Sequence, residues 1–400
     1  MQEKSKVLIL SSAYLPLIGG SELAIKNITD RLSDFEFDLI TARLDKSTSE
    51  YEKAGNVSVF RVGGSLSLST LLLPKSFLPI LIFFEAIKLL EKHDYAAVHA
   101  FQASGAAGAG WLLKYFYPKL PFIVTLQEGK NLQEQGFLIN FFRKLILKKA
   151  DRATAISQYL RNYILSVNKN LKVDVIPNGV NIDDFSRNFS YGELTDLENK
   201  LGIKPDDKVI VSVSRLVWKN GLDLLIEAIK ILNFKLQVPN SKLLIIGEGP
   251  LEKSLKSKVK SLKLDDRVIF TGSVENQDLP IYLKISDVFV RPSRSEGLGI
   301  SFLEAMAANV PIVATKVGGI PDFLEDPSTG SIGSPQAGSG QATGLFCSGE
   351  PEDIAFKIRI ILENDKLRGE LVNNARALVA EQYNWDKIAV EFDKLYKSLS

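Results

Sequence analysis

The chain has 400 residues, which at roughly 150 residues per domain predicts two or three domains. Hydrophobic residues make up 45% and charged residues 24%, the balance of an ordinary folded protein. The chain has 49 basic and 47 acidic residues, so its net charge is only +2 and bulk attraction to nucleic acid is not indicated. A single cysteine excludes an intrachain disulfide and a cysteine-based zinc cluster, and two histidines leave little room for a histidine metal site.

No segment has the pattern of a secretion signal or a membrane span. The most hydrophobic stretch, residues 71–90, is broken by two prolines and three charges, whereas a spanning helix needs about 20 apolar residues. We interpret it as a buried helix that starts at Pro79, with shallow contact to a bilayer as the alternative. We therefore expect a cytoplasmic protein.

Two successive series of strands and helices make up the chain. The first series has predicted strands at residues 6–12, 37–41, 57–62, 96–101, 122–126, 153–157 and 173–177. The second has predicted strands at residues 208–214, 242–247, 267–272, 288–292 and 311–315. Short strands rich in Val and Ile, without alternation and with helices between them, predict parallel sheets covered on both faces. We therefore expect an α/β protein with two Rossmann-like domains facing each other across a cleft.

The domain boundaries follow from these two series. We assign residues 1–180 to the first domain, 181–206 to a linker and 207–383 to the second domain. A stretch rich in Gly, Ser, Pro and Ala, residues 325–344, predicts a surface loop in the second domain.

The segment Glu296-Gly-Leu-Gly-Ile-Ser-Phe-Leu-Glu304 follows a predicted strand. Its two glycines permit a tight turn and close approach of the backbone to a ligand. We predict a helix from about Ile300, whose free N–H groups and positive dipole end favour a phosphate. Two carboxylates beside that helix start are suited to accept hydrogen bonds from a ribose or a sugar. A structural cap or ion pair is the alternative for Glu304.

The segment Ser214-Arg-Leu-Val-Trp-Lys-Asn-Gly221 follows the first strand of the second series. Arg215 and Lys219 are therefore expected near the carboxyl ends of the strands, where open α/β sheets bind ligands. A guanidinium and an ammonium there can neutralise a diphosphate that gains charge as it leaves. Surface charges at the end of a strand are the alternative interpretation.

Two glycine-rich turns give weaker signals. Gly19 and Gly20 lie between the first strand and the first helix, where many such turns look alike. The segment Gly247-Glu-Gly-Pro250 resembles the start of a dinucleotide fingerprint, but position 252 is glutamate where the third glycine belongs. We interpret it as a turn and not as a site for NAD.

Together these motifs resemble the family-4 glycosyltransferases, which are retaining enzymes with the GT-B architecture. The resemblance spans nearly the whole chain and rests on residues 19–22, 175–180, 215–217, 247–251, 267–274, 296–304 and 313–321. Its most specific part is the pair of glutamates separated by seven residues, with a flanking strand and helix.

The resemblance implies a nucleotide-diphosphate sugar as donor, held mostly by the second domain, and an acceptor in the first domain. It implies that helix 384–400 packs back on the first domain and that catalysis needs neither a metal ion nor a cofactor. Glu304 would bind ribose hydroxyls, Glu296 would contact the sugar, and Arg215 and Lys219 would hold the diphosphate. The other expected donor-binding residues are Gly19, Gly20, Gly249, Val274, Gly297, Leu298, Gly299 and Ile300.

Two positions depart from the family pattern. Gln127, which we count among the catalytic residues, stands where many relatives have a histidine near the donor sugar, and glutamine cannot hold a proton. His99 is not a clear substitute, and a packed histidine at the end of a strand is the alternative. Lys219 is displaced by one residue from the usual lysine-glycine pair.

A basic amphipathic helix is predicted from Gly136 to Ala150. Its apolar face holds Leu138, Phe142, Leu145 and Ile146. Three basic side chains are expected to point away from this apolar face: Arg143, Lys144 and Lys148. Such a helix can lie on an anionic membrane surface, and many enzymes of the resembling family glycosylate lipid-linked acceptors. An ordinary helix packed on the first sheet is the alternative.

We therefore predict a retaining glycosyltransferase that moves a sugar to a glycan or lipid-linked acceptor in cell-envelope or polysaccharide synthesis. Nucleic acid is not expected as a partner, and peripheral contact with the inner face of the cell membrane is left open. A GT-B epimerase or phosphorylase is a second enzyme interpretation. A pseudoenzyme that binds a nucleotide sugar as a scaffold is the alternative outside enzymes, because of Gln127.

Overall fold

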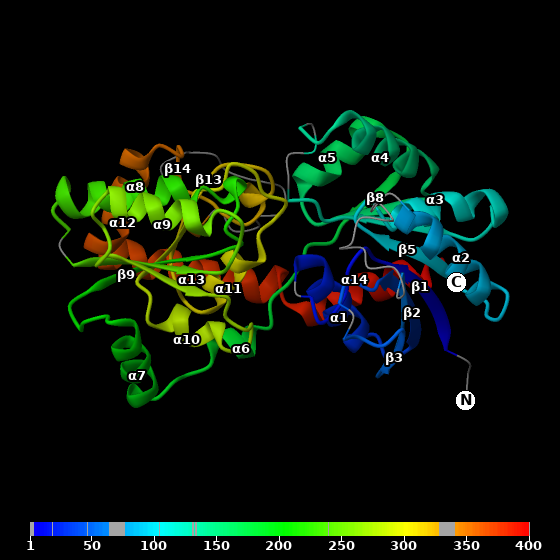
Figure 1. Ribbon diagram of the computed structural model, residues 1–400, viewed down its shortest axis with the longest axis horizontal. Helices are drawn as coiled ribbons and strands as arrows, with labels where there is room; N and C mark the ends of the chain where they lie inside the picture. The colour runs from blue at the N-terminus through cyan, green and yellow to red at the C-terminus, as the bar shows by residue number, and fades with distance from the viewer. Residues whose placement is uncertain are drawn as a thin grey trace. The chain divides into compact units, whose positions relative to one another are not determined.

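The computed structural model describes residues 4–399 except 18, 46, 64–76, 104, 130, 131, 133, 239 and 328–340. The chain divides into two compact units (Figure 1): unit 1 comprises Met1–Asn178 and Trp385–Ser400, and unit 2 comprises Gly179–Asn384. The loop predicted over residues 325–344 lies mostly outside the described residues. Each unit has its own sheet and its own hydrophobic core.

Unit 1 contains an eight-stranded sheet in the order β3-β4-β2-β1-β5-β6-β7-β8. Its strands are β1 (Ser5–Leu10), β2 (Phe35–Ala42), β3 (Tyr51–Ala54), β4 (Val57–Val62), β5 (Ala97–Phe101), β6 (Phe122–Leu126), β7 (Arg152–Ala155) and β8 (Lys172–Val175). All pairings are parallel except that of β3 with β4. The sequence did not predict β3, because its four residues are all exposed and form no apolar run.

The helices of unit 1 are α1 (Gly20–Arg31), α2 (Leu78–Leu90), α3 (Ala107–Phe116), α4 (Phe137–Lys149), α5 (Gln158–Val167) and α14 (Trp385–Lys397). The last helix, α14, joins the core of unit 1 through side chains at helical spacing, among them Trp385, Ile388, Phe392 and Tyr396. These residues pack with Phe35 and the rest of the core between α1 and the sheet. The C-terminal helix is therefore part of unit 1.

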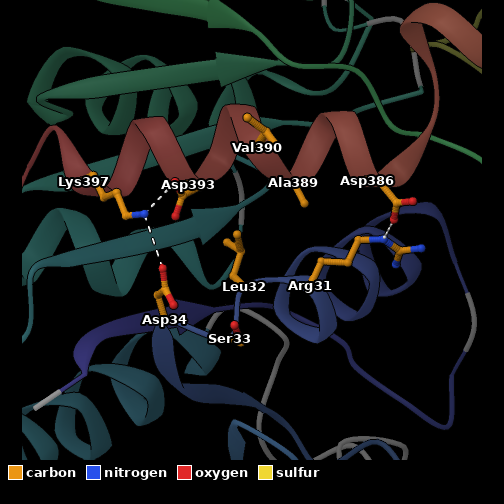
Figure 2. Close-up of a pocket in the computed structure, with 9 residues that line it drawn as sticks. All are labelled: Arg31, Leu32, Ser33, Asp34, Asp386, Ala389, Val390, Asp393 and Lys397. Carbon is orange, nitrogen blue, oxygen red and sulfur yellow. Dashed lines mark hydrogen bonds and ion pairs between the residues drawn. The ribbon is translucent and has the colours of Figure 1, made fainter. Parts of the chain in front are cut away.

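Ion pairs also join α14 to α1 and to the turn after α1 (Figure 2). Arg31 Nε donates to Asp386 Oδ1 at 2.7 Å, and Lys397 Nζ lies 3.4 Å from Asp34 Oδ2 and 2.9 Å from Asp393 Oδ2. Exposed pairs of this kind contribute little to stability, because water and salt screen the charges. The apolar contacts therefore do most to hold α14 in place.

His99 lies in the core of unit 1, where it connects α14 to the sheet. Its Nδ1 lies 2.7 Å from the Tyr396 hydroxyl, and its Nε2 lies 2.6 Å from Thr125 Oγ1. Complete burial lowers the pKa of His99 to about 3. His99 is thus a packed, neutral histidine, which is the alternative that the sequence left open.

Unit 2 contains a six-stranded parallel sheet in the order β11-β10-β9-β12-β13-β14. Its strands are β9 (Lys208–Val213), β10 (Ser241–Ile246), β11 (Val268–Gly272), β12 (Val288–Arg291), β13 (Ile312–Thr315) and β14 (Leu345–Cys347). The sequence did not predict β14, which has only three residues. In both units, the twelve predicted strands are present with ends shifted by at most two residues.

The helices of unit 2 are α6 (Ile182–Ser186), α7 (Tyr191–Leu201), α8 (Leu222–Phe234), α9 (Glu252–Ser261), α10 (Leu279–Lys284), α11 (Ile300–Ala307), α12 (Pro351–Glu363) and α13 (Asp365–Gln382), with short 3-10 helices at Trp218–Asn220 and Ile320–Asp322. In Figure 1, α8, α9 and α12 cover one face of the sheet, and α10, α11 and α13 cover the other. Residues 181–206, expected as a linker, contain α6 and α7 and belong to unit 2.

Candidate functional site

The loops at the carboxyl edge of the unit 2 sheet are packed closely together. Gly221, after β9, has φ +69°, and a Cβ there would lie 1.9 Å from the Pro292 carbonyl oxygen. Gly318, after β13, has φ +56°, and a Cβ there would lie 1.8 Å from the Glu296 carbonyl oxygen. Both positions require glycine, because the loops after β9 and β13 press against the loop that follows β12.

Glu296 is the centre of this edge. Its Oε2 accepts a hydrogen bond from Arg291 Nη2 at 2.7 Å and lies 3.5 Å from Lys219 Nζ, while its Oε1 accepts the N–H of Gly297 at 3.0 Å. The structure therefore brings Lys219 to the Glu296 loop, although the lysine is displaced by one residue in the sequence. One acceptor position of the carboxylate is left for a ligand hydroxyl.

Arg291 is a site residue that the sequence reasoning missed. Its buried guanidinium donates to Ser301 Oγ at 2.7 Å and lies over the Phe302 ring at 4.2 Å. Burial lowers the pKa of Arg291, while the charges of Glu296 and Glu304 act in the opposite direction. A charged residue inside a predicted buried strand was the available signal, because such a charge needs a partner.

Glu304 lies in α11, which begins at Ile300 as the sequence predicts. Its side chain is buried and its Oε1 accepts a hydrogen bond from Asn276 Nδ2 at 3.0 Å. Burial raises the pKa of Glu304 to about 7, although the Asn276 hydrogen bond and Arg291 oppose that rise. Glu304 therefore changes charge near neutral pH, and hydroxyl groups that donate to it would favour its ionised form.

Arg215 is exposed on the loop after β9, and its guanidinium makes no hydrogen bond or ion pair with the described residues. Glu248 connects this loop to the two neighbouring ones. The Glu248 carbonyl oxygen accepts the N–H of Leu216, after β9, at 2.9 Å. Glu248 Oε1 accepts the N–H of Ser273, which precedes Val274 in the loop after β11, at 3.2 Å. A Cβ on Gly249 would lie 2.5 Å from the Leu216 carbonyl oxygen. The expected donor-binding residues after β9, β10 and β11 thus follow one edge.

The remaining expected donor-binding residues of unit 2 form the turn into α11: Gly297, Leu298, Gly299 and Ile300. Gly299 caps the helix with φ +92°, and no side chain caps the helix start. This edge therefore combines a helix start with a buried guanidinium, two carboxylates, an ammonium and an exposed guanidinium. Such a set can bind a diphosphate through its cations and N–H groups and hydroxyls through its carboxylates.

In unit 1, Gly19 and Gly20 lie at the start of α1. A Cβ on Gly19 would lie 2.5 Å from Glu22 Oε2, so the buried Glu22 carboxyl lies directly against this glycine. Burial raises the pKa of Glu22, and Ser21 Oγ donates to its Oε2 at 3.0 Å. The contact of Gly19 and Gly20 with a donor stays a prediction.

Gln127 follows β6 at the carboxyl edge of the unit 1 sheet. Its Nε2 donates to Asn178 Oδ1 at 3.3 Å, and Asn178 Nδ2 in turn donates to Gln127 Oε1 at 3.4 Å. Its backbone N–H donates to Glu128 Oε2 at 2.9 Å. Glu128 is a second buried charge at a strand end that the sequence reasoning missed.

The helix predicted from Gly136 to Ala150 is present as α4, but its faces differ from the prediction. Arg143, which we expected to point away from the apolar face, is fully buried, because Glu128 supplies a buried counter-charge. Leu138 and Phe142, in contrast, are 67% and 51% exposed. The predicted apolar face is thus divided between solvent and the core.

Two further findings concern the described part of the chain. No helix there is both long and apolar enough to cross a membrane. In the same residues, no group of three or more His, Cys, Asp or Glu side chains is arranged to hold a metal ion.

Comparison with known families identifies both halves of the chain. Residues 18–184 match the family model described as Glycosyltransferase Family 4, and residues 195–378 match the model described as Glycosyl transferases group 1. The chain therefore belongs to the glycosyltransferases that combine these two domains. The resemblance inferred from the motifs is confirmed.

Individual proteins are similar over nearly the same length. The alpha-monoglucosyldiacylglycerol synthase of Acholeplasma laidlawii is 25% identical, covering 98% of this chain and 96% of its own. A GDP-mannose-dependent alpha-(1-6)-phosphatidylinositol monomannoside mannosyltransferase of Mycolicibacterium smegmatis is 28% identical, covering 82% and 84%. The structure of sucrose-phosphate synthase from Thermosynechococcus elongatus is similar with a TM-score of 0.83 and 22% identity, covering 99% of each chain. This likeness confirms the predicted GT-B fold with two parallel-sheet domains.

Proposed function

We propose that this glycosyltransferase is a retaining enzyme that moves a sugar from a nucleoside diphosphate sugar to a lipid-linked or glycan acceptor. The observation that carries the proposal is the cluster at the carboxyl edge of the unit 2 sheet. There Glu296, Arg291 and Lys219 are joined by contacts of 2.7 and 3.5 Å, beside the start of α11 that also carries Glu304. This set fits the three chemical parts of such a donor: ribose, diphosphate and sugar.

Each part of the donor has its own partners. Glu304 is placed one turn into α11 and accepts the ribose hydroxyls, and its raised pKa restricts the ionised, accepting form to about neutral pH and above. The diphosphate lies at the start of α11 between Arg215 and Lys219. Glu296, held by Arg291, accepts a hydroxyl of the donor sugar.

The reaction then depends chiefly on stabilising the leaving group. As the bond from the sugar to the phosphate breaks, the nucleoside diphosphate gains negative charge, which Arg215 and Lys219 neutralise. The acceptor attacks from the face of the leaving group, so the departing phosphate oxygen takes its proton and configuration is retained. Gln127 is suited to hold a sugar hydroxyl, since a glutamine cannot act as a general base. Neither a metal ion nor a cofactor takes part in this scheme.

A patch on unit 1, called here the apolar surface, supports a lipid-linked acceptor. It consists of exposed side chains on α2, α3 and α4: Ile80, Phe84, Tyr115, Phe116, Phe137, Leu138, Ile139, Phe141 and Phe142. The Phe83 ring lies 5.5 Å from that of Phe84 and 5.4 Å from that of Phe116, which connects α2 to α3. A patch of exposed aromatic and aliphatic side chains marks a contact surface.

The charges beside the apolar surface favour an anionic lipid as its partner. Lys144 and Lys148 are exposed on α4, and Lys149 Nζ lies 4.5 Å from the centre of the Tyr115 ring. Apolar side chains inserted among acyl chains, with lysines at the level of the headgroups, are the usual arrangement of a peripheral membrane helix. Two relatives carry glycerolipids in their names, diacylglycerol in one and phosphatidylinositol in the other. These observations support our proposal that the enzyme acts at the cytoplasmic face of the cell membrane, in envelope glycolipid or polysaccharide synthesis.

A binding and turnover screen tests the proposal. Thermal unfolding is followed with UDP- and GDP-sugars, because a ligand bound to the folded state raises the unfolding temperature. Donors that bind are then tested for transfer to diacylglycerol and phosphatidylinositol in phosphatidylglycerol vesicles, and for retention of configuration. Transfer with retention supports the proposal. Binding without turnover on any acceptor would instead support the scaffold alternative, and the absence of any nucleotide binding would refute both.

A further inference from the structure

The helix α4 is attached to unit 1 mainly by one charged side chain and two aliphatic ones. Its buried residues are Arg143, Ile146 and Leu147, all in its middle and second half. The first half belongs to the apolar surface and is exposed. Arg143 is therefore the buried charged side chain of α4 in unit 1.

Arg143 has a single charged partner among the residues that the structure describes. Its Nη1 donates to Asn140 Oδ1 at 2.8 Å and its Nη2 donates to Gln135 Oε1 at 2.5 Å, both neutral groups near α4 itself. Its Nε lies 4.0 Å from Glu128 Oε1 and has no hydrogen-bond partner in the described structure. The counter-charge of this buried guanidinium is therefore Glu128, which follows β6.

Glu128 also holds the backbone of two loops at the carboxyl edge of the unit 1 sheet. Its Oε1 accepts the N–H of Ala103, after β5, at 2.9 Å, and its Oε2 accepts the N–H of Gln127 at 2.9 Å. The Gln127 side chain continues this connection to Asn178, after β8. One carboxylate thus links α4 to three strand ends.

The charge state of Glu128 depends on α4. Burial raises its pKa, while the Arg143 charge and backbone hydrogen bonds from Glu128 itself, Ala103 and Gln127 lower it. No other charged group acts on Glu128 in the described part of unit 1. If Arg143 moved away, the carboxylate would be left buried without a counter-charge, which is strongly disfavoured. It would then take up a proton, and a protonated carboxyl no longer accepts both N–H groups equally well.

We propose that Glu128 is a positioning residue, and that its pairing with Arg143 transmits the state of α4 to the backbone of Ala103 and Gln127. A lipid surface that buries the first half of α4 holds Arg143 against Glu128 and thereby orders this edge for the acceptor. This inference rests on the proposed function only in naming a lipid as the partner of α4. The link from Arg143 to the two loops stands on the contacts alone.

Hydrogen exchange of the full chain tests the link without a substrate. Arg143→Met removes the counter-charge, Arg143→Lys keeps it, and Lys169→Met removes an exposed charge elsewhere in unit 1 as a control. We expect Arg143→Met to speed exchange at Ala103 and Gln127 about tenfold or more. Arg143→Lys should lie near the parent, and the control should match it. Unchanged exchange at both loops in Arg143→Met would overturn the proposal, as would equal acceleration in the control.

Vesicles of phosphatidylglycerol then separate this proposal from the proposed function. In the parent they should slow exchange in α4 and in both loops, whereas in Arg143→Met they should slow exchange in α4 alone. Equal slowing of the loops in Arg143→Met would contradict transmission through the pair. If vesicles slow hydrogen exchange neither in α4 nor in the loops of the parent, a lipid is not the partner of α4. The exchange rates of the variants measured without vesicles still decide the role of Glu128.

A pH profile distinguishes positioning from a merely structural role. In Arg143→Met the pKa of Glu128 rises further, so the acidic limb of kcat should move to higher pH, by about one unit or more, with activity recovered at alkaline pH. KM for the donor, which is bound by unit 2, should change by less than about twofold. Glu128→Gln should lower kcat with no recovery at alkaline pH. Should Arg143→Met fail to fold, Arg143→Gln, which also removes the counter-charge, provides the same comparison. A uniform loss at all pH values in the folded Arg143 variant overturns the proposal.

Discussion

Replacing Glu304 with Gln should make the protein without ligand more stable at alkaline pH and at the same time weaken nucleotide binding. The pKa of Glu304 is raised from 4.5 to about 7, which corresponds to about 3 kcal/mol against the ionised form in the fold. The stability contributed by the neutral carboxyl is fully present below pH 4.5 and is lost as pH rises through about 7. Glutamine stays neutral and can still accept the Asn276 hydrogen bond. At pH 8 the free energy of unfolding should therefore rise by up to about 3 kcal/mol, or roughly 6–12 °C.

Nucleotide binding should change in the opposite direction. A hydrogen bond to a charged group contributes about 1.5–3 kcal/mol, so the variant should bind UDP or GDP about 10–150 times more weakly at pH 8. At pH 5.5 the parent carboxyl is itself mostly protonated, and the two proteins should bind nearly alike. The half-exposed Glu363→Gln serves as a control, because that carboxylate pairs with Arg359 away from the site.

The assay is thermal unfolding with and without nucleotide at both pH values, together with titration calorimetry. The reasoning is refuted if Glu304→Gln is destabilised at pH 8 like an ordinary core substitution. It is equally refuted if its nucleotide affinity at pH 8 equals that of the parent.

Three further predictions concern other parts of the molecule. Arg215→Ala should raise the activation free energy by about 2–4 kcal/mol, which lowers kcat about 30- to 1,000-fold, because it removes the exposed guanidinium that meets the charge of the leaving group. Steady-state kinetics with the donor checks this. His99, held neutral with a pKa of about 3, should by itself lower the free energy of unfolding by about 1.4 kcal/mol per pH unit on acidification from pH 6.5 to about 3. The difference between urea titrations of the parent and of His99→Gln over this range isolates that contribution and checks it. Leu138→Asp should reduce flotation with phosphatidylglycerol vesicles, whereas Tyr191→Asp, at an 85% exposed position of unit 2, should not. Equal effects of the two aspartates would contradict a specific membrane surface.

The positions of most strands and the glycine-rich loops could be predicted from the sequence because their causes are local. Buried parallel strands form unbroken runs of Val and Ile, so the series could be recognised with ends shifted by at most two residues. Gly299 and Ile300 mark the start of α11 in the same local way. The strands β3 and β14 lack such runs, one being fully exposed and the other only three residues long.

The partners of the buried charges could not be predicted, because tertiary packing and not local periodicity brings each pair together. Arg291 is stable at the end of β12 only because two carboxylates come to it, one of them from the following helix. Arg143 and Glu128 are separated by a loop and meet through packing that helical periodicity cannot show. A helical wheel assigns Arg143 to a polar side, whereas the partner that determines its burial, Glu128, lies in the loop after β6.

The most direct test of the account is a crystal structure of the enzyme with UDP or GDP bound, chosen by the affinity screen. We expect the diphosphate at the N-terminal turn of α11 within hydrogen-bonding distance of Arg215 or Lys219, and the ribose hydroxyls on Glu304. A nucleotide bound elsewhere in unit 2, or one whose ribose does not contact Glu304, would contradict it.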